Sequence, residues 1–112
     1  MKRTIELENY CINIIRRTEN FLGYKKHKVI FENPTKRKRI FGSHSCRLGI
    51  IFINIEFLKT IRRLSMTCVH EVCHCEIKRH SKKFYLKVIE TSNCLFDGKD
   101  FEKYNYDDRF KY

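Results

Sequence analysis

Two histidines stand four residues apart in the segment His70-Glu71-Val72-Cys73-His74, and a third, His80, follows after five more residues. If this segment is helical, the His70 and His74 side chains lie one above the other and can bind one metal ion together. Glu71 projects from the adjacent face, where it can reach a metal-bound water without being a ligand. Three protein ligands plus an open position are typical of a catalytic zinc site. An HExxH segment can also occur by coincidence on an amphipathic helix. The surrounding residues must therefore distinguish a metal site from a chance match.

His80 can join such a site only if the chain turns. On an unbroken helix it would lie ten residues beyond His70, roughly 15 Å along the axis. We therefore expect the helix to end after about Ile77 and Ser81 to begin a new helix as its N-cap. The alternative is that His80 is a surface residue in a basic stretch.

The chemistry of this site would be hydrolysis. Zn²⁺ held by three neutral imidazoles lowers the pKa of a coordinated water towards about 7, and Glu71 would act as general base. The helical pattern places Cys73 on the core face, His70 and His74 at its edge, and Glu71 further towards solvent. Cys73 is therefore expected to serve packing, whereas a role for Cys75 stays open.

Other segments must position these residues. In chain order, patterning predicts a helix over 4–22 closed by Gly23, a β-type run over 28–32, an extended segment over 39–41, a strand over 49–55 buried on both faces, a helix over about 56–64, the motif helix over about 65–78 and a last helix after Ser81. Gly42-Ser43-His44-Ser45 is expected to break the extended segment, and 95–112 to be an irregular strap or tail. These elements predict a single α+β domain over 1–112, with a small sheet packed against helices.

Composition limits the class of protein. The chain has 112 residues, with no apolar run long enough to span a bilayer and no apolar signal core after its start. We therefore expect a protein of the cytoplasm or nucleus, neither secreted nor held in a membrane, with monomer as the default state. Its six cysteines are then expected to be reduced thiols.

The formal net charge of +11 favours polyanionic partners, above all nucleic acid. An AT-biased genome also inflates lysine, and the absence of Ala, Gln and Trp fits that alternative. Clustering argues partly against it, because only Glu32 interrupts the basic residues of 25–39. The candidate nucleic-acid or anion contacts are Lys25, Lys26, Lys28, Lys36, Arg37, Lys38 and Arg39.

Four segments together resemble the minimal zinc metallopeptidases of the SprT-like, WLM and YgjP-like group. They are Gly42-Ser43-His44-Ser45, Ile51-Phe52-Ile53-Asn54, His70-Glu71-Val72-Cys73-His74 and His80-Ser81-Lys82-Lys83-Phe84-Tyr85. The YgjP-like pattern is Trp-Gly-Ser-Cys-Ser, a strand ending in Leu-Asn, HELCH, and Asn-His-Ser-Lys-x-Phe-Trp. Order and spacing agree from about Phe41 to Val88, which makes the resemblance more specific than HExxH alone.

The resemblance implies a small zincin-like α+β fold with a catalytic core over about 41–90. It implies His70, His74 and His80 as Zn²⁺ ligands, and Glu71 as the catalytic acid/base. Relatives in this group are associated with repair by proteolysis of proteins crosslinked to DNA, a role that the basic cluster would suit. His44 replaces the usual Cys, and Phe41 and Tyr85 replace Trp, which leaves the substrate open.

The same histidine spacing occurs in metzincins, but those have glycine where this chain has Ile77 and need a methionine after the motif. Both methionines, Met1 and Met66, precede it. We therefore expect a zinc metallopeptidase that acts on proteins associated with DNA or crosslinked to it. The alternatives are a metal-dependent hydrolase of a phosphate-containing small molecule, with Lys36 to Arg39 as the anion site, and a zinc-stabilised nucleic-acid-binding module without turnover.

Overall fold

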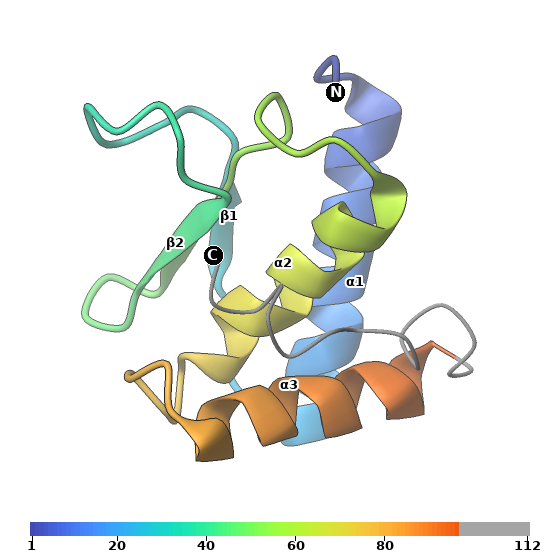
Figure 1. Cartoon of the computed structure of the whole chain (residues 1–112), viewed down its shortest axis with the longest axis vertical. Helices are drawn as coiled ribbons and strands as arrows, with labels where there is room; N and C mark the ends of the chain where they lie inside the picture. Colours follow the sequence, from blue (N-terminus) through green and yellow to red (C-terminus); the bar gives the residue numbers. More distant parts are fainter. Residues whose placement is uncertain (97–112) are drawn as a thin grey trace.

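The computed structural model describes residues 1–96, which form three helices and a three-stranded mixed sheet (Figure 1). In chain order the elements are α1 (Ile5–Leu22), β1 (Lys28–Ile30), β2 (Gly42–Ser45), β3 (Ile50–Ile53), α2 (Ile61–Cys73) and α3 (Lys82–Leu95). The α+β class is confirmed. The strap or tail predicted over 95–112 lies, apart from its first two residues, outside the described residues.

The ends of α1 follow from local chemistry. The Thr4 side chain accepts a hydrogen bond from the Leu7 N–H at 3.2 Å, which caps the first turn. Gly23 closes the helix in the left-handed conformation at φ 73°, which glycine adopts without steric cost. The predicted bounds of this helix are therefore confirmed to within a residue.

The sheet is built around β3, in the order β1-β3-β2. β3 pairs in parallel with β1 and antiparallel with β2. Ile51, Phe52 and Ile53 are each at most 1% exposed, which confirms the predicted burial on both faces. α2 lies between the sheet and α1 and also contacts α3, so the motif helix is the centre of the fold (Figure 1).

The prediction that Gly42-Ser43-His44-Ser45 interrupts extended structure is wrong, because these residues form β2. The turn lies instead after β2 and ends at Gly49, whose φ is 63°. Gly42 is needed for contact rather than for a turn. A Cβ there would lie 2.6 Å from the Phe52 carbonyl oxygen, so only glycine lets the two strands approach this closely. Pairing with β3 thus outweighs the low strand propensity of this segment.

Two predicted helices, about 56–64 and about 65–78, are also wrong in their bounds. A single helix, α2, begins after Thr60, whose side chain accepts from the Arg63 N–H at 3.1 Å. It ends at Cys73, five residues earlier than predicted. No glycine or proline lies between Glu56 and Ser65. The composition therefore does not show where the turns after β3 end and where α2 begins. Among residues 1–96, no helix has both the length and the apolarity required to cross a bilayer.

Candidate metal centre

Three imidazoles meet where α2 ends and α3 begins. His70 lies in the last turn of α2, His74 is its C-cap, and His80 directly precedes Ser81, the N-cap of α3. The Nε2 atoms of His70 and His74 are 3.1 Å apart, those of His70 and His80 are 3.1 Å apart, and those of His74 and His80 are 3.0 Å apart. The structure therefore brings together all three histidines that the sequence nominated as metal ligands.

Hydrogen bonds alone cannot satisfy this triangle when the rings are neutral. His74 Nδ1 lies 3.0 Å from the Ile77 carbonyl oxygen, which assigns its proton to Nδ1 and leaves Nε2 as a bare acceptor. At most two of the three contacts can then contain a hydrogen. A cation is attracted to all three nitrogens, and an ion at about 2.0–2.1 Å from each in tetrahedral geometry separates its ligands by roughly 3.3 Å. The donor set thus fits a divalent ion of this class.

Burial keeps the imidazoles in the form that binds metal. Desolvation is the main cause that lowers the pKa of His70 well below its usual value, and it also lowers the pKa of His74 and of His80. Neutral imidazole with a free lone pair is the metal-binding form. These rings are therefore available to a cation at neutral pH.

The return of His80 depends on the turn between the helices and on the first turn of α3. Ser81 caps α3 by accepting from the Phe84 N–H at 3.2 Å, and its own N–H donates to the Arg79 carbonyl at 2.8 Å. Phe84 stacks on the His74 ring with a centroid distance of 4.3 Å. Tyr85 lies nearly parallel to the His80 ring at 6.0 Å. Sequence patterning identified Phe84 and Tyr85 as apolar residues of the last helix but not as supports of the metal ligands.

Glu71 lies beside the three imidazoles, and the prediction that it points further towards solvent is wrong. Its exposed fraction is 3%. β2 covers this side of α2, and a Cβ on Gly42 would lie 3.3 Å from Glu71 Oε2. Burial raises the pKa of the Glu71 carboxyl to about 8. Helical periodicity alone could not show this, because it does not say what covers the second face of a helix.

A cleft of about 590 Å³ opens over these residues. Glu71, the three histidines and all four residues of the strand Gly42–Ser45 line it. Four cationic side chains also line the cleft, namely Arg37, Arg39, Arg47 and Lys78.

The seven basic residues singled out in the sequence are all exposed, but they do not form one surface at the cleft. Only Arg37 and Arg39 line it. Asn54 helps to place them, because its side-chain amide donates to the Ile40 carbonyl at 2.9 Å and to the Lys38 carbonyl at 3.3 Å. Arg47 and Lys78 were missed, since they are isolated in sequence and join the rim only through the fold.

A second group of side chains suited to metal binding comprises His27, His44 and Cys75. From the sequence, His44 was identified only as a departure from a motif, and a role for Cys75 was left open. His27 was not identified as a candidate. Because these residues are distant in sequence, no local spacing could have indicated the group.

No protein-family model, no curated protein and no solved structure matches this chain significantly. A function must therefore be inferred from the chemistry of the site and from the motif resemblance.

Proposed function

We propose that the chain is a zinc-dependent metallopeptidase with a zincin-like fold, in which His70, His74 and His80 hold the metal and Glu71 is the general base. The observation that carries the proposal is the triangle of Nε2 atoms, 3.0–3.1 Å apart, with a buried carboxylate in the same cleft. Two of these groups come from one helix and the third returns after a turn, which is the arrangement that the motif resemblance implies.

Zinc fits the donor set. Neutral imidazoles suit Zn²⁺ and several other transition ions, while three protein ligands leave a position open to solvent in the cleft. A bound Zn²⁺ would supply a Lewis acid that activates water and polarises a carbonyl group.

Glu71 supplies the proton chemistry. A cation among the three imidazoles would attract the negative carboxylate and oppose the effect of burial on its pKa. In that state Glu71 can accept a proton from the attacking water and then deliver it to the leaving amine.

A peptide is the substrate class that the shape of the cleft favours. Within residues 1–96, β2 pairs only with β3, so its outer edge is open, and all four of its residues line the cleft. An extended peptide can hydrogen-bond to such an edge strand. Its scissile bond would then lie between β2 and the three histidines.

The positive charge of the cleft rim indicates which peptides the cleft would favour. Arg37, Arg39, Arg47 and Lys78 would draw acidic groups towards the cleft, which supports proteins bound or crosslinked to nucleic acid as substrates. The same side chains also suit a phosphate-containing small molecule, the second candidate. The six cysteines are free, which supports the proposal of an intracellular location.

Replacement of Glu71 by Gln tests catalysis directly. The amide cannot accept the proton, so we expect hydrolysis of unfolded casein to fall by about 10²- to 10⁴-fold. Zinc content and circular dichroism should match the wild type. Equal hydrolysis by wild type and Glu71→Gln would overturn the catalytic assignment, and no hydrolysis by either protein would favour a non-catalytic binding module.

Stimulation by nucleic acid tests the substrate class. We expect single-stranded DNA to accelerate histone digestion by the zinc-loaded protein, and the gain to shrink as salt rises, because salt screens contacts with phosphate. Inertness towards every protein substrate, combined with hydrolysis of a phosphate ester, would support the small-molecule alternative.

A further inference from the structure

A second cluster of metal-binding side chains lies beside the first and draws on three separate parts of the chain. His27 directly precedes β1, His44 belongs to β2, and Cys75 lies in the turn that follows α2. The Nε2 atoms of His27 and His44 are 3.0 Å apart. The Cys75 sulfur lies within 4.8 Å of the histidine donor atoms.

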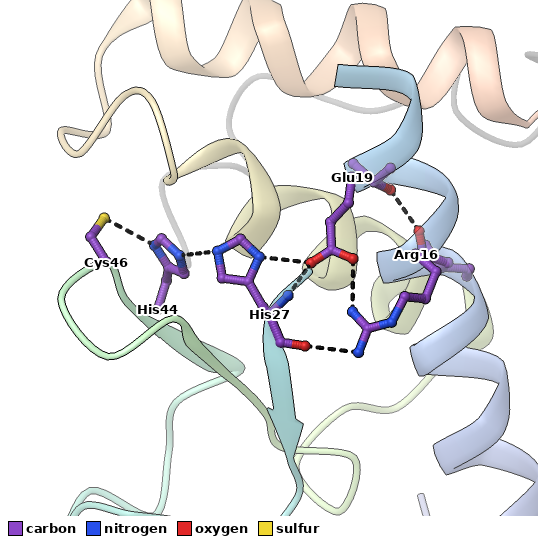
Figure 2. Close-up of polar contacts among 7 residues, drawn as sticks. Arg16, Glu19, His27, His44 and Cys46 are labelled. Atoms are coloured by element: carbon purple, nitrogen blue, oxygen red, sulfur yellow. Dashed lines mark hydrogen bonds and ion pairs between the residues drawn. The ribbon is translucent and has the colours of Figure 1, made fainter. Parts of the chain in front are cut away.

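The outer nitrogen of each imidazole in this cluster is already engaged (Figure 2). His27 Nδ1 lies 2.7 Å from Glu19 Oε2, and His44 Nδ1 lies 3.5 Å from Cys46 Sγ. Both rings therefore direct Nε2 towards the same point. A histidine that ligates a metal usually donates its other N–H to a carboxylate, which fixes its tautomer and its orientation.

Glu19 is itself held firmly. It is 1% exposed, accepts from the His27 backbone N–H at 2.6 Å and pairs with Arg16 at 2.7 Å. His27 is only 6% exposed. Such a pre-oriented imidazole differs from a surface histidine, whose ring can rotate.

We propose that His27, His44 and Cys75 form a second metal site, separate from the three-histidine centre, that takes a thiophilic ion such as Zn²⁺. Imidazole and thiolate are both good ligands for zinc, and a water or a fourth side chain would complete the tetrahedron. On binding, the Cys75 sulfur releases its proton to solvent and forms the bond to the metal, with no change of oxidation state.

A hydrogen-bonded chain without metal is the competing explanation. His44 Nε2–H can donate to His27 Nε2, while Cys46 donates to His44 Nδ1. That chain satisfies both rings, but it gives no role to Cys75. The two explanations therefore differ in whether the Cys75 sulfur bears a metal.

The position of this site suggests a structural role. Its ligands tie β2 to the turn that carries Cys75, directly after His74. β2 and His74 both line the cleft. A metal at the second site would therefore hold these two parts of the cleft lining in place relative to each other, without taking part in hydrolysis.

Cobalt spectroscopy tests the assignment, because thiolate bound to Co²⁺ gives a charge-transfer absorption that imidazole ligands do not give. We use the full chain with His80→Ala, which disables the first centre and makes the result independent of the proposed function. We expect the thiolate band in His80→Ala, and its loss when Cys75→Ser or His44→Ala is added.

Cys94→Ser and Cys46→Ser are the matched controls. Cys94 is an exposed cysteine at the far end of α3, and the Cys46 sulfur faces the outer nitrogen of His44. Both variants should keep the band in the His80→Ala chain. No band in that chain, or a band that survives Cys75→Ser, would overturn the second site. Melting curves of the metal-free proteins would show whether a variant that loses the band is still folded.

Discussion

At the scale of single residues, the chemistry depends on a carboxylic acid buried beside three neutral imidazoles. Burial disfavours the charged form of each group, so without a cation the site is neutral. Glu71 has its pKa raised to about 8, and His70 has its pKa lowered. A divalent ion would change this balance for Glu71. It binds neutral imidazoles, and its positive charge favours the ionised form of a nearby carboxylate.

This environment predicts a pH dependence of stability for the metal-free protein. The pKa of Glu71 rises from 4.5 to about 8 on folding, so the folded state binds more protons than the unfolded state between those values. Stability therefore falls as pH rises through this window and levels off above it. Relative to Glu71→Gln, the wild type should lose roughly a few kcal/mol between pH 5 and pH 8.

Urea unfolding in the presence of a chelator measures this difference. Both proteins contain the same histidines, so the contribution of these histidines to the pH dependence cancels in the comparison. The remaining difference comes from Glu71, and we therefore expect the two profiles of stability against pH to diverge. Parallel profiles of stability against pH would show that burial does not raise the pKa of Glu71 in the folded protein.

Two members of the histidine triangle, His70 and His74, were predicted because HExxH places them together by helical geometry, whereas His80 was nominated mainly through the motif resemblance. The burial of Glu71 was not predicted, since it arises from β2 covering α2. The Glu19–His27–His44 chain was also missed, because it joins residues whose proximity depends entirely on the tertiary fold.

At the scale of elements, two boundaries decide the site. α2 must end near His74, and α3 must begin directly after His80. The second boundary follows from a side chain visible in sequence, the Ser81 cap. The first does not, because no glycine or proline marks it. α2 ends instead in tight turns, in which the Cys75 N–H donates to Val72 and the Glu76 N–H to Cys73.

β2 is the element that the sequence misjudged and on which the cleft depends. Its first residue, Gly42, pairs with Ile53 of β3 and leaves little space for a side chain between β2 and Glu71. Gly42→Ala would place a Cβ 2.6 Å from the Phe52 carbonyl oxygen and 3.3 Å from Glu71 Oε2. Because backbone rather than a flexible side chain must move, we expect a destabilisation of about 1–3 kcal/mol.

The matched control is Ser43→Ala in the same strand, which removes an atom group instead of adding one and should change stability by only about 0.5 kcal/mol. Thermal unfolding measures both variants. Equal melting temperatures for Gly42→Ala and wild type would mean that β2 does not pack against β3 and α2 as closely as described.

At the scale of the whole molecule, a metal ion would join parts that the chain alone connects loosely. The three-histidine centre ties the end of α2 to the start of α3, and the proposed second site ties β2 to the turn between them. An ion that binds only the folded state stabilises it in proportion to its affinity. Removal of metal should therefore lower stability as well as activity.

Metal content per chain, measured in the presence of a competing chelator, tests the three-histidine centre most directly. The protein carries His44→Ala, so that an ion at the second cluster does not contribute. We predict about one zinc ion per chain, and an affinity at least about 100-fold lower when His80→Ala is added, because one of three ligands is lost. Full zinc retention at unchanged affinity in that double variant would remove His80 from the site and contradict the account.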